Sequence, residues 1–353
     1  MCNFEVIMKR MFKHKFTVVY ATLFCLLGAS LLNFKSVAPA EDYQPDAYVY
    51  EVLRDLGATL PAYYPEKLNP DDVQRGKDIV FFGRTKNPKG GKSAYISLYY
   101  MCTNCHNTVM EDPNLANNSD PEARLDFAIK NNIPFLQGTT FYGIANRETW
   151  YNDDYYKKYG DLVKPANNDL RQAIQLCGKE CSKGRYLEDW EETAVLAYYL
   201  SISYRLQDIL TTAQIAELNS KKNNAAQHPE LIKWIKSFYA LKSPAAFVEP
   251  PYENGNSLPV GDPARGKALY ELSCQTCHKA YGCSDNVFDN SSFTFKKFNR
   301  DFDKDYWWLF KSVRHGYYGY PGHDPYMPHY TAERMSDKQV MDLKAYFQQQ
   351  AGS

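Results

Sequence analysis

The strongest constraint on this chain of 353 residues is a five-residue pattern, Cys-x-x-Cys-His, that occurs twice. Residues three apart on a helical turn lie on one face. Both thiols of each copy can therefore bond to the two vinyl groups of one porphyrin, while the histidine faces the iron. The pattern predicts two covalently attached haem c groups. The residues concerned are Cys102, Cys105 and His106 in the first copy and Cys274, Cys277 and His278 in the second.

Paired cysteines also occur in zinc sites and in thioredoxin-like dithiols. A zinc site would need further pairs of Cys or His, which we do not find beside either copy. A redox dithiol would not need the histidine in both copies. We therefore expect haem at both copies rather than zinc or a dithiol.

The N-terminus predicts export. Residues 1–40 carry five Lys/Arg and one Glu, with an apolar run over residues 16–34 and a small-residue site, Ala38-Pro39-Ala40. This pattern indicates a signal peptide cleaved after Ala40, although the run is long enough for an uncleaved membrane anchor. A periplasmic location suits haem c, which is attached outside the cytoplasm. The formal net charge of zero gives no indication of nucleic-acid binding.

The two halves of the chain repeat one order of features. A helix carrying Arg-Gly-Lys at 75–77 or 265–267 precedes each Cys-x-x-Cys-His copy, and an amphipathic helix ends each half. This order resembles the cytochrome c fold, in which the first and last helices cross, and Gly76 and Gly266 would permit a close crossing. We expect an all-α protein with two cytochrome c-like domains in tandem. The expected boundaries are 41–205, a linker at 206–258, and 259–353.

The sixth iron ligand in the second half is expected to be Met327. Met327 is followed by Pro328 and lies between the second haem motif and the last helix, as in the methionine-ligand loop of small cytochromes c, which this segment resembles. His/Met coordination raises the reduction potential of a haem. The competing ligands are His323, His329 and Met335. A capping-box pattern, Ser336 with Gln339, predicts the start of the last helix.

The sixth ligand in the first half follows from elimination. No further histidine occurs between His106 and residue 205. Met110 is only four residues from His106 and on the wrong side of the ring. Cys177 and Cys181 remain, on a helix predicted to start at Asp169. Thiolate is a known haem ligand, and its negative charge favours ferric iron.

We assign Cys177 as this ligand, with several alternatives left open. Cys181 could take its place, or the iron could be open or hold another ligand. A disulfide between Cys177 and Cys181 would be geometrically tight on a regular helix, and Cys181 could instead bond to Cys283. Outside residues 1–40 and the four motif thiols, three cysteines remain, so at least one is unpaired in a monomer.

At these residues the chain resembles the dihaem thiosulfate dehydrogenases and the SoxA-type cytochromes of sulfur oxidation. In those families a ligand cysteine precedes a glycine and a leucine at a fixed offset, and Cys177, Gly184 and Leu187 match that spacing. Residues 143–147 resemble the segment before that helix. Met327 matches the second, His/Met haem. Cys181 is not part of the family pattern, which puts the substrate in doubt more than the ligation.

The resemblance implies that the Cys177 haem meets a small sulfur oxyanion and that two thiosulfate ions are joined into tetrathionate. The Met327 haem would pass electrons to a soluble or membrane-bound redox partner, a cytochrome or an oxidase. A dianionic substrate requires cations near the iron. The candidate cations are Arg147, Lys183, Arg185, Lys179 and Arg171.

A second function fits the same sequence. A dihaem electron carrier that feeds an oxidase or a membrane complex needs no substrate pocket. A thiolate-ligated haem is an unusual choice for a simple carrier, which favours the enzyme slightly. A dihaem peroxidase is disfavoured, because it needs distal acid-base residues and no histidine is available near the first haem.

Overall fold

The computed structural model describes residues 41–251, 258–318 and 326–352. The chain divides into two units after Asp42, and all elements discussed below belong to the second, Tyr43–Ser353. The second unit is mainly helical, as expected, with one short antiparallel pair of strands in its described residues. The predicted signal peptide or anchor over residues 1–40 lies outside the described residues.

Most helices are short and are joined by loops and single turns. Within the described ranges, none combines the length and the apolar character that a membrane-crossing helix requires. The helices and strands are α2 (Val49–Asp55), α3 (Pro70–Phe82), α4 (Pro121–Asn131), α5 (Tyr156–Tyr159), α6 (Val163–Ala166), α7 (Leu170–Leu176), α8 (Asp189–Ser201), α9 (Leu206–Ile209), α10 (Thr212–Lys221), α11 (His228–Lys236), α12 (Pro263–Leu269), α13 (Gln275–His278), α14 (Ser292–Lys304), α15 (Trp308–His315), α16 (Asp337–Gly352), β1 (Tyr317–Tyr318) and β2 (Tyr326–Met327).

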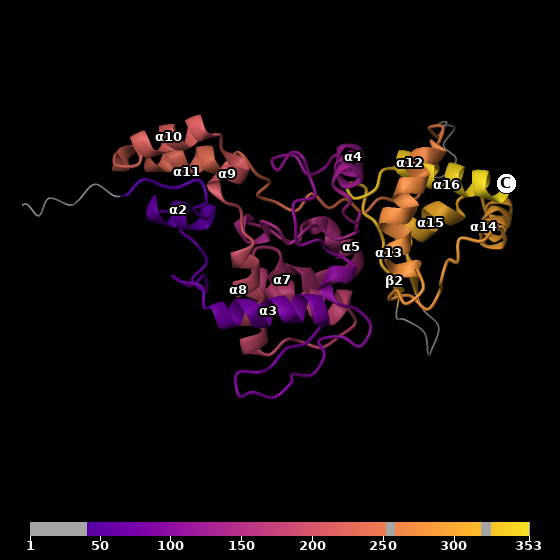
Figure 1. The fold of residues 1–353 in the computed structure, drawn as a ribbon, viewed down its shortest axis with the longest axis horizontal. Coiled ribbons are helices and arrows are strands. Elements are labelled where there is room, and N and C mark those ends of the chain that lie inside the picture. The colour runs from indigo at the N-terminus through magenta and orange to yellow at the C-terminus, as the bar shows by residue number, and fades with distance from the viewer. Residues whose placement is uncertain (1–40, 252–257, 319–325, 353) are drawn as a thin grey trace, which may run out of the picture. The chain divides into compact units, whose positions relative to one another are not determined.

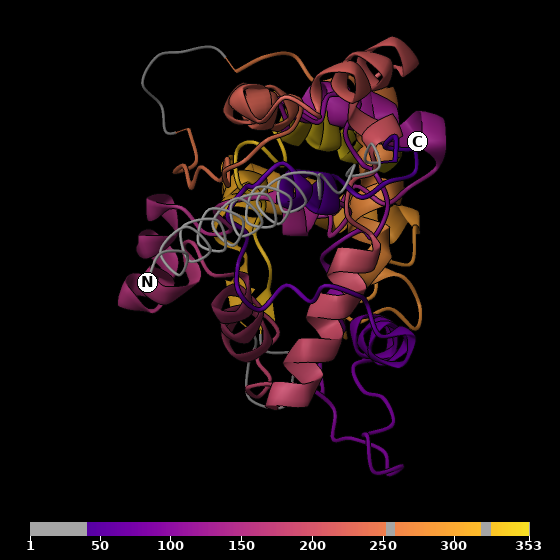
Figure 2. The same ribbon diagram turned by 90° about the vertical axis from the view of Figure 1, so that its left-hand side faces the viewer.

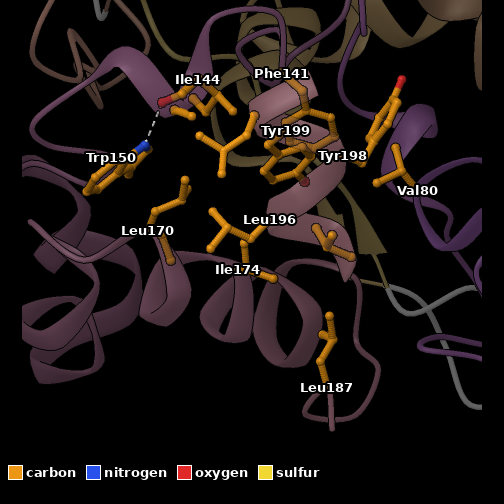
Figure 3. Close-up of a cluster of buried hydrophobic side chains, with 14 of the residues drawn as sticks. Val80, Phe141, Ile144, Trp150, Leu170, Ile174, Leu187, Leu196, Tyr198 and Tyr199 are labelled. Carbon is orange, nitrogen blue, oxygen red and sulfur yellow. Dashed lines mark hydrogen bonds between the residues drawn. The ribbon is translucent and has the colours of Figure 1, made fainter. Parts of the chain in front are cut away.

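The first core forms where α3 packs against α8, a contact that Figures 1 and 2 show from two directions. Gly76 lies at the contact, where a Cβ atom would overlap the carbonyl oxygen of Ala194. Figure 3 shows the apolar side chains that fill this core, with the Trp150 indole donating to the Ile144 carbonyl at 2.9 Å. Burial of these side chains is the main force that holds the helices together.

The second core repeats this contact. α12 packs against α16, and a Cβ atom at Gly266 would overlap the carbonyl oxygen of Asp342. α12 runs through a π-helical turn, Tyr270–Cys274, directly into α13. The predicted cap of α16 is confirmed, because Ser336 Oγ accepts from the Gln339 amide at 3.1 Å and the Gln339 side chain accepts from the Ser336 amide at 3.0 Å.

Residues 206–241, which we assigned to a linker, carry a core of their own. Their helices α9, α10 and α11 pack on α2 from the start of the unit, and the four lie together in Figure 1. Residues of α2 such as Val52 and residues of α11 such as Ile235 are almost fully buried there. Helix α2, near the start of the unit, is thus part of a third apolar cluster.

The two halves of the sequence interlock. Leu125 and Ala128 of α4, with Phe135 after it, belong to the second core although they precede it by more than a hundred residues in the chain. The division at 205 and 259 therefore does not separate the side chains of the two cores. Tertiary packing decides this, because the apolar face of α4 packs into the second core.

A buried ion pair joins the halves next to the first haem motif. Arg334 Nη1 lies 2.7 Å from Glu111 Oε1, and both side chains are only 3% exposed. Arg334 also donates to the Leu136 and Gly138 carbonyls at 2.8 Å each. Burial alone would raise the pKa of Glu111, but Arg334 and Arg124 lower it to about 2. Glu111 is therefore ionised throughout the physiological range.

We expect Gly266→Ala to destabilise the protein by about 2 kcal/mol or more, because the new methyl group forces α12 away from α16. Urea unfolding of the haem-loaded protein measures this. Gly352→Ala is the matched control, since Gly352 is also helical but has open space around its Cα atom. Equal unfolding midpoints for the two variants would show that the close crossing is not needed.

We expect Glu111→Gln to destabilise the protein by about 3–5 kcal/mol, because it leaves the buried Arg334 charge without its partner. The pKa of Glu111 is depressed, so its contribution is complete above about pH 4.3 and is lost as the pH falls towards about 2. The stability difference between variant and wild type should shrink over that window. Glu217→Gln, in the exposed Lys221 pair, should cost less than about 1 kcal/mol. A pH-independent difference would contradict the assignment.

Candidate functional site

The two motif histidines are held in the same way. His106 Nδ1 lies 2.6 Å from the Thr139 carbonyl oxygen, and His278 Nδ1 lies 2.7 Å from the Asn286 carbonyl oxygen. Each bond assigns the proton to Nδ1 and leaves Nε2 free as a metal ligand. Phe141 stacks on the His106 ring with centroids 4.3 Å apart, and Phe288 stacks on the His278 ring at 4.0 Å. Burial lowers the pKa of both histidines, which favours the neutral, ligating form.

Cys177 and Cys181 lie in the same cavity as His106, as expected from the sequence. Asp169 caps α7 by accepting from the Arg171 amide at 2.8 Å, so the helix begins where predicted. α7 ends at Leu176, however, and residues Cys177–Cys181 form a π-helical turn. Both thiols are free, so the structure contains neither alternative disulfide among its described cysteines.

Polar side chains beside the Cys177–Cys181 turn gather on Cys181 rather than on Cys177. The hydroxyl of Tyr159 lies 3.2 Å from the Cys181 sulfur and that of Tyr151 lies 3.6 Å from it. A hydrogen bond from Cys177, with support from the Lys158 ammonium and these hydroxyls, lowers the pKa of Cys181. The same bond and burial raise the pKa of Cys177. Of the two thiols in the turn, Cys181 therefore ionises more readily than Cys177.

Of the predicted cations, Arg147 lines this cavity and the others do not. Burial lowers the pKa of Arg147. Its guanidinium group makes no ion pair or hydrogen bond within the described ranges. Arg185 is instead committed to Glu191 by two bonds of 2.6 and 2.7 Å. The remaining three lie elsewhere: Lys183 is 3.6 Å from Glu180, Arg171 pairs with Glu192, and Lys179 lies over the Tyr186 ring.

The second motif opens onto a cavity of about 550 Å³. Met327 and Met335 both line it, while His329 does not. Met335 is 1% exposed and belongs to the second core. His329 is packed against Phe247, and burial together with Lys158 lowers its pKa to about 3. His323 lies outside the described residues. The methionine in β2 and the histidine in α13 thus share one cavity.

The two cavities adjoin. Tyr100, Cys105 and Gln137 line both of them. Burial raises the pKa of the Cys105 thiol, and the Cys277 thiol of the other motif raises it further. Groups bound at the two motifs would therefore meet near their attachment points.

The residues of both cavities fit covalent haem. Each cavity offers both thiols of its Cys-x-x-Cys-His motif, a motif imidazole whose Nδ1 is bonded to a carbonyl oxygen, and a largely apolar lining that suits a flat macrocycle. When bound, haem supplies one-electron oxidation and reduction of its iron.

Lys158, Tyr151 and Tyr159 are the site residues that the sequence did not reveal. They lie in the Tyr- and Asp-rich stretch from 150 to 161, whose composition was unusual but whose spacing matched no motif. α5 and the turns beside it bring this stretch against the Cys177–Cys181 turn. Only the density of tyrosines could have drawn attention to it.

No curated protein matches the chain. Residues 261–347 match the family model described as cytochrome C oxidase, cbb3-type, subunit III. The match includes the second Cys-x-x-Cys-His motif, Met327 and most of α16. Residues 261–347 are therefore a c-type cytochrome domain, a type of domain that binds haem c covalently and transfers electrons.

Proposed function

We propose that the protein is an exported dihaem cytochrome in which residues 41–205 supply a second cytochrome c-like domain. The support is the repetition of one arrangement. Gly76 against Ala194 and Gly266 against Asp342 make equivalent helix crossings. Each Cys-x-x-Cys-His histidine also makes the same Nδ1 bond to a carbonyl and the same stack on a phenylalanine. The basic and apolar pattern of residues 1–40 supports a periplasmic location.

Cys177 and Met327 are the proposed sixth ligands. Cys177 shares the first cavity with His106, and Met327 shares the second with His278. Cys181 is the alternative in the first cavity, but two tyrosine hydroxyls already contact its sulfur. No tyrosine hydroxyl contacts the Cys177 sulfur within the described part of the chain, and its one hydrogen bond there is to the other thiol, Cys181.

The activity that this arrangement supports best is the interconversion of thiosulfate and tetrathionate. The observation that carries it is a pair of cations near the Cys177–Cys181 turn: Arg147 lines the cavity that holds both thiols, and the charge of Lys158 acts on Cys181. Neither cation has an ion pair within the described residues, so a dianion would compensate both. When bound, the two haems can store the two electrons released as two thiosulfate ions form one tetrathionate ion. Arg147 and Lys158 would bind and orient the anion.

A relay without a substrate is the second candidate. Its support is the exposed apolar surface around the second cavity, where Phe293 is 76% and Val287 is 45% exposed. Exposed apolar side chains of this kind commonly mark protein–protein contacts. A redox partner docked there would lie beside the Met327 cavity. An enzyme would need the same surface, because it too must pass the electrons taken from its substrate to a redox partner.

We expect Cys177→Ala to remove the thiolate signature of one haem, because it deletes the proposed ligand atom. Electron paramagnetic resonance of the oxidised protein measures this, with the His/Met haem as an internal reference. Cys181→Ala is the matched control and should leave both signatures in place. A loss in Cys181→Ala alone would transfer the ligand role to Cys181, and a loss in neither would exclude thiolate ligation.

We expect the purified protein to form tetrathionate from thiosulfate with ferricyanide as acceptor. Lys158→Ala should lower kcat/KM by roughly 10- to 100-fold, the range for losing a hydrogen bond to a charged group. Lys164→Ala is the control, because Lys164 is exposed and paired with Asp161 at 3.0 Å. No turnover with normal haem reduction by a partner would support the relay. An equal effect of both variants would place the substrate elsewhere.

A further inference from the structure

One tyrosine connects the segments that carry the two proposed sixth ligands. Tyr326 precedes Met327 in β2, and its hydroxyl donates to the Cys181 carbonyl at 2.6 Å. Cys181 closes the turn that begins at Cys177. A single side chain therefore spans from the methionine strand to the cysteine turn, although these segments are 145 residues apart in the sequence.

A second tyrosine closes this connection from the side of the first haem motif. The Tyr100 hydroxyl donates to the Tyr326 carbonyl oxygen at 2.5 Å, and the two rings meet edge to face at 6.2 Å. Tyr100 lies two residues before Cys102 and lines both cavities. Two residues of the first half thus hold Tyr326: Tyr100 binds its backbone carbonyl, and the Cys181 carbonyl binds its hydroxyl.

Two lysines from the first half fix the Tyr326 ring. Lys158 Nζ lies 5.2 Å from the ring centroid and Lys183 Nζ lies 5.6 Å from it. Cations at such distances are attracted to the ring by its quadrupole. Lys158 is also the cation that lies beside Cys181. The orientation of Tyr326 therefore depends on the same groups that surround the thiols.

We propose that Tyr326 is a positioning residue that couples the two haem sites, so that a displacement of the Cys177–Cys181 turn is passed to Met327. The inference rests on the ligation proposed above for Cys177 and Met327. The physical reason is that hydrogen bonds weaken steeply when their geometry is disturbed. If the turn shifts, the Tyr326 hydroxyl must follow it or lose its bond. Either response changes the strand that holds Met327 in register with Tyr317.

A double-mutant cycle on the haem-loaded protein tests the coupling through a reduction potential. The four proteins are wild type, Cys177→Ala, Tyr326→Phe and the double variant, and the quantity is the midpoint potential of the His278 haem. Cys177→Ala should shift this potential more when residue 326 is the wild-type tyrosine than when the protein also carries Tyr326→Phe. The electrostatic effect of the lost thiolate is present in both backgrounds, so additive shifts would overturn the proposal.

Amide hydrogen exchange tests the connection without reference to ligation. Tyr326→Phe removes the bond to the Cys181 carbonyl and should speed exchange about fivefold in both the Cys177–Cys181 turn and β2. Tyr100→Phe should act on β2 in the same way. Tyr239→Phe is the control, because the buried Tyr239 hydroxyl has no hydrogen-bond partner among the described residues. Faster exchange in β2 alone, or in neither segment, would overturn the proposal.

The two experiments also separate this proposal from the one on which it rests. If Cys177→Ala leaves the first haem unchanged, the ligand assignment fails, and the exchange rates still decide whether Tyr326 connects the segments. If Cys177→Ala changes that haem and exchange in the turn is unaffected by Tyr326→Phe, the ligation stands and the coupling is wrong.

Discussion

The buried ion pair between Glu111 and Arg334 fixes one half of the chain against the other. Burying two charges costs several kcal/mol per ion, which close contact and further hydrogen bonds must offset. Here the contact is 2.7 Å, and Thr140 and Asn107 donate to the remaining lone pairs of Glu111 at 2.8 and 2.9 Å. Asn107 directly follows the motif histidine. The pair therefore sets where the second half lies relative to the first haem motif.

This placement makes the two cavities neighbours. Tyr100, Cys105 and Gln137 come from the first half and line both cavities, and Glu333, beside Arg334, reaches the first cavity from the second half. An electron carrier needs a short distance between its redox groups, and an enzyme that removes two electrons from a substrate needs the same short distance. Residues of both halves line each of the two cavities.

The first cavity differs from the second in the sulfur groups that line it besides its motif thiols. Cys177 and Cys181 of the first cavity lie in a π-helical turn, where the wider backbone spacing departs from the regular α-helix on which they were expected. Tyrosine hydroxyls and Lys158 stabilise negative charge there. The second cavity offers neutral methionine sulfur in a largely apolar wall. A charged ligand stabilises ferric iron and a neutral one ferrous iron, so electrons would move from the first site to the second.

Local patterns determined much of this protein. Short-range hydrogen bonding predicted the starts of α7 at Asp169 and of α16 at Ser336, and the structure confirms both. Covalent spacing within each Cys-x-x-Cys-His motif predicted a haem at each, and the family match supports a c-type cytochrome domain around the second motif. Tertiary structure decided the rest. The packing of α4 into the second core, the third cluster around α2, and the convergence of Lys158 and Tyr326 on Cys181 join residues far apart in sequence. Such contacts depend on which apolar faces find partners and which buried charges are compensated, and no local spacing encodes either.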